Sequence, residues 1–256
     1  MSETALQTEG LNKRFGSLVV ANDVTLSLPA GARHALIGPN GAGKTTLINM
    51  MTGRVKPDSG VIRLGGEVIT RLSPDARVKR GLVRTFQITT LFPRLSPLEA
   101  VTLAVCERRG EAADWRRGFA AHRDAVDEAF HILAALGLAD NCTRETRLLG
   151  YGQQRLLEIA LALATRPKVL LLDEPAAGVP RGESAQLFEA IAALPHDISV
   201  LFIEHDMGIV FRFAARIIVL VGGTVMTVGT PEEIAADERV REVYLGSADH
   251  GIARHG

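Results

Sequence analysis

The sequence predicts an α/β fold with a parallel sheet at its centre. Val169–Leu172, Ile198–Ile203 and Ile217–Val221 are continuous apolar runs, typical of strands that are buried on both faces. Helical segments lie between these runs, which is the alternation that a parallel sheet requires. A shorter apolar run, Ala35–Ile37, leads through a glycine-rich loop into a helical segment that begins at Thr46. These observations predict a strand–loop–helix unit that belongs to the same sheet.

Strands and a hairpin are predicted in the N-terminal part of the chain. Thr4–Asn12 and Val19–Leu28 have the alternating pattern of half-buried strands. Val61–Ile69 predicts a hairpin that turns at Gly65-Gly66. Ser73–Gly81 offers an N-cap serine, a proline at the first helical position and a closing glycine, so it predicts a short helix.

Residues 88–165, approximately, are predicted to form a helical lobe inserted between strands of the core. Ser96–Glu99 is a capping box that opens one helix, and Asp124–Leu136 predicts another. The apolar face of the second helix is predicted to contain Val126, Phe130 and Leu133. The charged segment Glu107–Asp124 predicts a solvated helix or loop, with a contact surface for a partner as the alternative.

Residues 4–245 are predicted to form a single domain, and residues 246–256 a frayed tail. Thr230–Glu233 is a further capping box and predicts the start of a C-terminal helix. Within the domain, the helical lobe is the only inserted segment that the sequence pattern predicts.

Composition limits the classes of function. The 29 basic and 29 acidic side chains cancel, so no overall field attracts nucleic acid or an anionic membrane, and we expect no nucleic-acid partner. Cys106 and Cys142 form no close-spaced metal or redox pattern, which suggests a reducing compartment. Residues 1–10 have no signal-peptide core, and no apolar run approaches the ~18 residues that span a bilayer. We therefore expect a cytosolic chain, or one docked on a membrane through another protein.

The glycine-rich loop Gly38–Thr46 fits the phosphate-binding pattern G-x-x-x-x-G-K-[ST]. It consists of Gly38, Pro39, Asn40, Gly41, Ala42, Gly43, Lys44, Thr45 and Thr46. Gly41 and Gly43 allow backbone N–H groups to converge on phosphate oxygens, and the helix start adds its dipole. Lys44 is predicted to reach the β- and γ-phosphates, and Thr45 to place a hydroxyl on Mg²⁺. This loop alone leaves kinases, GTPases, helicases and transport ATPases open, with a chance glycine-rich turn as the structural alternative.

A pair of carboxylates follows the apolar run Val169–Leu172. Ligand sites in open α/β sheets lie at the C-terminal ends of the strands, where Asp173 and Glu174 are predicted to be. Asp173 is predicted to hold Mg²⁺ through water, and Glu174 to polarise the attacking water. A charged turn after a core strand is the alternative.

A second glycine-containing helix start precedes those carboxylates. It consists of Leu149, Gly150, Tyr151, Gly152 and Gln153, and a helical run follows to Ala164. Its glycines expose backbone N–H groups at a helix N-terminus, which makes a second anion cradle. The segment resembles the signature motif of ABC ATPases, usually Leu-Ser-Gly-Gly-Gln. This resemblance implies that the segment binds the γ-phosphate of an ATP held by another subunit. Gly150 replaces the usual Ser, which removes one hydrogen bond from a hydroxyl to the γ-phosphate. Tyr151 replaces a Gly.

Further residues are similar to motifs of the same family. Gln87 resembles the Q-loop glutamine, which implies contact with Mg²⁺ or the attacking water and a link to the helical lobe. His205 resembles the switch histidine that contacts the γ-phosphate. Phe15 resembles the aromatic residue that stacks on adenine, with packing in the N-terminal sheet as the alternative. Pro180 stands where the family's D-loop usually has Asp or Asn, so hydrogen bonds across a dimer are in doubt there.

The resemblance implies a P-loop NTPase with a RecA-like core, an N-terminal antiparallel β subdomain and an inserted α-helical subdomain. The runs Tyr-Gly-Gln-Gln-Arg, Asp-Glu-Pro-Ala-Ala-Gly, Ile-Glu-His-Asp-Met and Val-Tyr-Leu-Gly are most similar to ATP-binding subunits of branched-chain amino acid importers. Relatives of that group handle urea, short amides and other small polar solutes. The implied function is ATP hydrolysis, with ATP and Mg²⁺ bound, to drive solute import.

The implied partners are transmembrane permease subunits, a second ATP-binding subunit in a head-to-tail dimer and, indirectly, a periplasmic solute-binding protein. The implied location is the cytoplasmic face of the membrane, as a peripheral subunit. An ABC exporter subunit, for example for lipid or lipopolysaccharide, remains the main alternative. A DNA-repair ABC protein would need a long inserted coiled coil, and a translation-type protein usually has two ATPase units. A GTPase would need Asn-Lys-x-Asp, whereas Asn12-Lys13 is followed by Arg14.

Overall fold

The computed structural model describes residues 3–85, 91–111 and 122–245. Its strands are β1 (Thr4–Phe15), β2 (Leu18–Pro29), β3 (Arg33–Ile37), β4 (Ser59–Leu64), β5 (Glu67–Val68), β6 (Leu82–Arg84), β7 (Val169–Asp173), β8 (Ser199–Ile203), β9 (Arg216–Val221) and β10 (Thr224–Gly229). Its α-helices are α1 (Lys44–Met51), α2 (Pro74–Val78), α3 (Pro97–Arg109), α4 (Arg123–Ala135), α5 (Tyr151–Ala164), α6 (Arg181–Ala192), α7 (Met207–Phe213), α8 (Pro231–Ala236) and α9 (Glu238–Leu245). Short 3-10 turns, η2 (Ala139–Asn141) and η3 (Thr146–Leu148), connect α4 to α5.

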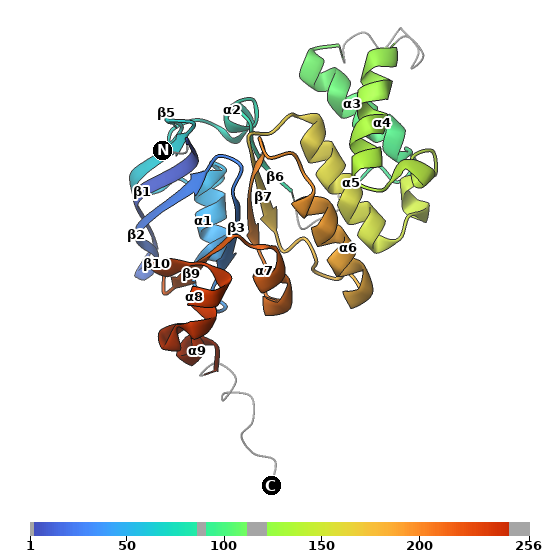
Figure 1. Cartoon of the computed structure of the whole chain (residues 1–256). Helices are drawn as coiled ribbons and strands as arrows, with labels where there is room; N and C mark the ends of the chain where they lie inside the picture. Colours follow the sequence, from blue (N-terminus) through green and yellow to red (C-terminus); the bar gives the residue numbers. More distant parts are fainter. Residues whose placement is uncertain (1–2, 86–90, 112–121, 246–256) are drawn as a thin grey trace.

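The strands form an antiparallel sheet and a largely parallel one, as the sequence predicts. The antiparallel sheet has the order β2-β1-β4-β5, and the parallel sheet has the order β10-β9-β3-β8-β7-β6. Strands β9, β3, β8, β7 and β6 run parallel, whereas β10 pairs antiparallel with β9 at the edge. Because the parallel strands point the same way, the segments that follow β3, β7 and β8 all emerge at the lower edge in Figure 1. The predicted α/β fold is confirmed.

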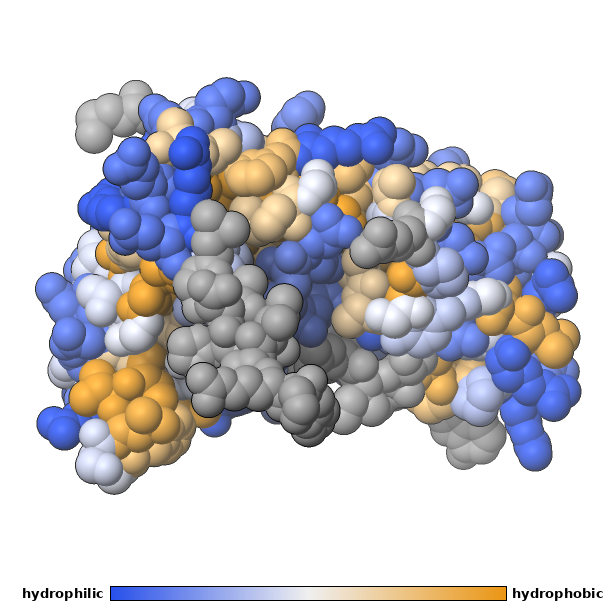
Figure 2. Space-filling model, turned by 90° about the horizontal axis from the view of Figure 1, so that it is seen from below, coloured by the Kyte–Doolittle hydropathy of each residue, from blue (hydrophilic) through white to orange (hydrophobic). Residues whose placement is uncertain are grey.

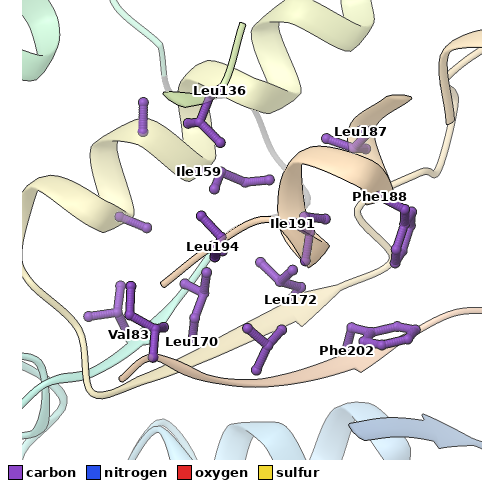
Figure 3. Packing of buried hydrophobic residues seen from close by; sticks show 14 of the residues in the cluster. Val83, Leu136, Ile159, Leu170, Leu172, Leu187, Phe188, Ile191, Leu194 and Phe202 are labelled. Carbon is purple, nitrogen blue, oxygen red and sulfur yellow. The ribbon is translucent and has the colours of Figure 1, made fainter. Parts of the chain in front are cut away.

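The parallel sheet separates a hydrophobic cluster on one face from another on the opposite face. Alternate residues of β7 show this: Leu170 and Leu172 belong to the cluster beneath α5 and α6, and Val169 and Leu171 to the cluster around α1. Figure 3 shows Leu170 and Leu172 on the side of the sheet that faces the helices, below Ile159 and Ile191. Burial on both faces explains why the β7 sequence is continuously apolar.

Helices α3, α4 and α5 pack together on the right of Figure 1, away from the antiparallel sheet. The predicted apolar face of α4 is wrong in part, because Phe130 is exposed and Val126 only half-buried. The buried positions are Ala125, Ala129 and Leu133. Alanine permits close approach of helix axes, so the helix buries the face with small side chains rather than the one with large ones.

Local end signals in the sequence agree with the helix boundaries. Ser73, Ser96 and Thr230 each accept a backbone N–H at the start of α2, α3 and α8. Strand β10 is not predicted by the sequence analysis. Gln87, most of the charged segment and the tail 246–256 lie outside the described residues. Among the helices of the described ranges, we find none with the length and hydrophobicity to cross a membrane.

Candidate nucleotide-binding and hydrolysis site

The phosphate loop joins the end of β3 to the start of α1. Its last glycine, Gly43, has φ 99° and is the N-cap of α1, where no side chain caps the helix. The first N–H groups of α1 are therefore available to an anion. Lys44 is 7% exposed, and its ammonium group donates to Gly38 O at 2.7 Å and Pro39 O at 3.1 Å. Uncapped N–H groups beside a buried ammonium group fit a nucleotide phosphate chain.

The other predicted residues of the loop lie in the turn or in the first turn of α1: Pro39, Asn40, Gly41, Ala42, Thr45 and Thr46. Burial lowers the pKa of Lys44, and the negative charges of Glu174 and Asp173 act in the opposite direction. The side chains predicted to hold phosphate and metal are thus close enough to interact electrostatically.

Residues that are far from the phosphate loop in sequence contact it and support its backbone. A Cβ at Gly43 would lie 2.3 Å from Val20 O, so β2 passes directly against the loop. Gly223, in the turn between β9 and β10, donates its N–H to Ala42 O at 3.0 Å. On α9, burial raises the pKa of Tyr244 to about 12, while a hydrogen bond with the Gly38 backbone lowers it. No local sequence motif marks these contacts, so they could not be predicted from the sequence.

Asp173 ends β7 and is 4% exposed. Its Oδ2 accepts a hydrogen bond from Arg84 Nη2 at 2.5 Å, which is also an ion pair. Carboxylate and hydroxyl oxygens are ligands that Mg²⁺ prefers, so Asp173 and the exposed Thr45 fit the predicted metal role. Gln87, the third predicted metal ligand, lies outside the described residues.

Glu174 and His205 meet at the lower edge of the parallel sheet. His205 Nε2 lies 3.0 Å from Glu174 Oε1. Glu174 has φ 50°, a left-handed conformation that is rare for a non-glycine residue, and its N–H donates to Ile203 O at 3.0 Å. Two residues chosen from separate motifs are therefore in direct contact, in an arrangement suited to orienting a general base.

Glu204 is a buried carboxylate that the sequence analysis missed as a site residue. Its Oε1 accepts the N–H of Ala176 at 2.9 Å, and its Oε2 accepts the N–H of His205 at 3.2 Å. Burial raises its pKa. Glu204 therefore ties the loop after Glu174 to the segment of His205. A carboxylate between apolar Ile203 and His205 was the available signal.

The second glycine-containing helix start, Leu149–Gln153, lies at the N-terminus of α5. Gly150 is the N-cap, and its N–H donates to Gln153 Oε1 at 3.2 Å. A Cβ at Gly152 would lie 2.5 Å from Glu183 Oε2, so α6 approaches the backbone closely there. Gly150, Gly152 and Gln153 also line a hollow of about 390 Å³ against α6. Leu149 and Gly152 are buried, whereas Gly150 and Tyr151 are exposed, so the first residues of α5 are the accessible part of the segment.

Tyr151 fills the space beside the loop that follows Glu174. A Cβ at Gly178 would lie 3.2 Å from Cε1 of Tyr151, and Gly178 has φ 78°. Arg155 donates from Nη2 to the Tyr151 hydroxyl at 2.9 Å and from Nη1 to Glu158 Oε2 at 2.8 Å. The large residue in the variant segment is thus accommodated by a glycine in the loop 174–180.

Phe15 is 51% exposed at the end of β1, so the alternative that it packs inside the antiparallel sheet is wrong. Lys13 Nζ lies 5.3 Å from the centre of its ring. Phe15 pairs with Leu18 across the turn into β2, shortly before the Val20 carbonyl that touches the phosphate loop. Figure 2, seen from the lower edge, shows a hydrophilic hollow in the middle of this face and hydrophobic side chains gathered at its left end.

Within one chain, the structure brings together the phosphate loop, Asp173, Glu174 and His205. The segment Leu149–Gln153 is not part of that group, since α1 and α5 lie on different sides of the parallel strands in Figure 1. The chain therefore carries two helix starts that are predicted to bind anions and that lie apart from each other.

Comparison with known proteins identifies the family. Residues 21–177 match the family model described as ABC transporter. The chain belongs to the ABC transporter ATP-binding family. Residues 224–250 also match a model described as branched-chain amino acid ATP-binding cassette transporter. The prediction of an ABC ATPase with a P-loop NTPase fold is confirmed.

Curated relatives align over nearly the whole chain. The high-affinity branched-chain amino acid transport ATP-binding protein BraF of Pseudomonas aeruginosa is 40% identical, covering 97% of this chain and 100% of its own. LivG of Escherichia coli K12, with the same description, is 39% identical with the same coverage. A solved nucleotide-free ATP-binding cassette of an ABC transporter is 31% identical, with a TM-score of 0.81 and coverage of 94% of this chain and 98% of its own. Another, in its ADP conformation, has 31% identity and a TM-score of 0.80, covering 95% and 99%.

Proposed function

We propose that this chain is the ATP-hydrolysing subunit of an importer for branched-chain amino acids or a related small polar solute. The observation that carries the proposal is the match of residues 224–250 to the branched-chain transporter model, beside relatives described as branched-chain amino acid transport proteins. This match favours an importer over the exporter alternative. As a subunit of such an importer, it would bind permease subunits at the cytoplasmic face of the membrane.

ATP would bind at the phosphate loop. The first N–H groups of α1 and the Lys44 ammonium group would hold the phosphates, and Phe15 would stack on the adenine. Thr45, Asp173 and Gln87 would hold Mg²⁺, which neutralises charge on the phosphates during transfer. Lys44 would exchange its hydrogen bonds with the Gly38 and Pro39 carbonyls for bonds to phosphate oxygens.

Hydrolysis would depend on Glu174. Its carboxylate would take the proton of the attacking water, and His205, 3.0 Å away, would orient that carboxylate and contact the γ-phosphate. Leu149–Gln153 of a second ATP-binding subunit, identical or paralogous, would complete the site, because these residues lie apart from the phosphate loop of their own chain.

The permease subunits would dock in a groove between α2 and α5. This groove, of about 400 Å³, is bounded by Val78, Leu91 and Leu161 among other residues, and also by Arg84. The groove lies beside the strand that leads to Gln87, so a docked segment would touch residues close to the site. Solute and solute-binding protein would not contact this chain directly.

The test reconstitutes the protein with candidate branched-chain amino acid permease subunits, in lipid vesicles that contain the solute-binding protein. We expect ATP hydrolysis to rise when leucine, isoleucine or valine is added, and to stay low with an unrelated solute. A rate that no permease or solute changes would overturn the importer assignment.

Glu174→Gln tests the catalytic assignment in the same vesicles. ATP binding should persist, while turnover should fall by at least about 100-fold because the base is lost. Glu189→Gln is the matched control, since Glu189 pairs with Arg212 on the exposed surface of α6. Normal turnover of Glu174→Gln would show that another residue is the base.

A further inference from the structure

Arg84 forms a buried link between the Asp173 carboxylate and α1. Its side chain is 10% exposed and that of Asp173 is 3% exposed. One arm of the guanidinium group, Nη2, donates to Asp173 Oδ2 at 2.5 Å, and the other, Nη1, donates to Asn49 Oδ1 at 2.6 Å. Both arms are therefore committed to side chains, one of which is the carboxylate proposed for Mg²⁺.

Another buried arginine, Arg77, shows what a purely structural role looks like in this fold. Its guanidinium group donates to the backbone carbonyls of Met50, Met51, Thr70 and Leu72. Those contacts fasten the end of α1 to the segment before α2 and touch no ionisable side chain. Arg84 differs because its guanidinium group pairs with the carboxylate of Asp173, which is proposed to serve Mg²⁺. The same group also donates to the side-chain amide of Asn49, which holds it in place.

Lys44 does not take over this task. Its ammonium group donates to the carbonyls of Gly38 and Pro39, and in the proposed function it turns to phosphate. A carboxylate as buried as Asp173 needs a compensating charge, which Arg84 supplies by direct contact and Lys44 adds to only by electrostatic attraction over a longer distance.

We propose that Arg84 is a positioning residue for the Mg²⁺ site, which holds Asp173 through Oδ2 while Asn49 fixes the guanidinium group. The inference rests on the proposed function, since it presumes that Asp173 serves the ion. Groups that orient metal ligands from outside the coordination shell typically change metal affinity by about 10–100-fold when they are removed. Arg84 also borders the groove between α2 and α5, so the ion site and the proposed permease dock share one side chain.

The experiment measures ATP binding by the full chain without hydrolysis, first in EDTA and then across a Mg²⁺ titration. We expect Arg84→Gln to raise the Mg²⁺ concentration for the half-maximal response by about 10–100-fold. Its ATP affinity in EDTA should stay within about twofold of the unmodified protein, because the phosphate loop is untouched. Arg84→Lys should recover only part of the response, since a single ammonium group cannot replace the guanidinium fork.

Asn49→Ala is the second variant, because Arg84→Gln leaves Asp173 buried without its partner and can impair folding. Asn49 lies on α1, where alanine is a favourable helix residue, and the substitution removes no charge. We expect Asn49→Ala to raise the Mg²⁺ concentration for the half-maximal response by about threefold or more, which is less than the rise expected for Arg84→Gln. Arg80→Gln, which breaks an exposed ion pair with Glu67, should change nothing.

The outcomes separate the two proposals. If Asn49→Ala, and Arg84→Gln where it folds, respond to Mg²⁺ as the unmodified protein does, Arg84 has no positioning role. If the unmodified protein binds no ATP, or binds it without any response to Mg²⁺, the proposed function fails and this inference fails with it.

Discussion

The two glycine-containing helix starts of this chain differ in how much of their surroundings the chain itself supplies. At α1, Gly43 lies against Val20 O, Ala42 accepts from Gly223, and Lys44 is 7% exposed. At α5, a Cβ at Gly150 would meet Gln153 Oε1 at an ordinary contact distance of 3.9 Å, and Tyr151 is 39% exposed. The first start is enclosed by its own fold. The second is buried at Gly152 but exposed at Gly150 and Tyr151, and those exposed residues could meet a nucleotide held by another chain.

The largest difference should come from placing the same methyl group at each start. Gly43→Ala should destabilise the protein by about 2–4 kcal/mol, because a positive φ is combined with a clash against backbone. Gly150→Ala should cost less than about 1 kcal/mol, since its φ is −61° and the nearest atom to the new methyl group, Gln153 Oε1, lies 3.9 Å away. Urea unfolding of both variants measures this. Equal losses would contradict the comparison.

The stability of the protein should also depend on pH, because the strand that leads into the phosphate loop carries a buried histidine. His34 on β3 is buried, and burial, with a smaller contribution from the charge of Arg216, lowers its pKa from 6.5 to about 4. The unfolded chain therefore binds a proton between these values while the folded chain does not, so stability falls as pH drops from about 6.5 to 4.

The expected loss is up to about 3 kcal/mol over that range, and His34→Leu should flatten it. Denaturant midpoints at intervals of pH provide the measurement. His196→Gln is the control, because His196 is exposed. An unchanged slope in His34→Leu would assign the acid sensitivity to other groups.

A double-mutant cycle can test how Tyr151 is accommodated. Gly178→Ala should cost about 1–2 kcal/mol, partly from the φ of 78° and partly from contact with the Tyr151 ring. Removing the ring with Tyr151→Ala should recover the contact part, so the double variant should be less destabilised than the sum of the single variants. Strict additivity in thermal unfolding would mean that the ring and Gly178 are not coupled.

The smallest effect is expected from restoring the usual serine at position 150. Gly150→Ser should change stability by only a few tenths of a kcal/mol. One added hydrogen bond to the γ-phosphate, worth about 1 kcal/mol, should lower the KM for ATP about fivefold in the assembled transporter. ATP binding by the isolated chain should stay the same. A matching change in the isolated chain would contradict the assignment of this segment to a second subunit's nucleotide.

Sequence patterns predicted the parts of the fold that depend on neighbours in the chain. Ser96 and Thr230 mark helix starts because an N-cap and its partner are three residues apart, and β7 is recognisable because both of its faces are buried. Strand β10 was missed because it is a half-exposed edge strand without a strong alternating pattern. On α4, large apolar residues were expected inside, whereas close helix packing selected Ala125 and Ala129.

For the candidate site, the motifs located the residues but not their contacts. The pairing of Glu174 with His205 follows from adjacent parallel strands, since β7 and β8 place their ends side by side. Arg84 had no motif of its own, and its bond to Asp173 joins positions 89 residues apart. Glu204 was overlooked because a carboxylate near a turn is usually solvated, and only the fold reveals that this one is buried.

The residues that support the phosphate loop also determine when the loop can reach its final surroundings during synthesis of the chain. The loop leaves the ribosome early, but β8, Gly223 and Tyr244 emerge later, the last of them about 200 residues afterwards. At about 5–20 residues per second, this delay lasts roughly 10–40 s. During that interval the loop exists without the strand beside β3 and without the contact at Gly38. The nascent chain thus acquires the full set of contacts around its phosphate loop only after Tyr244 has left the ribosome.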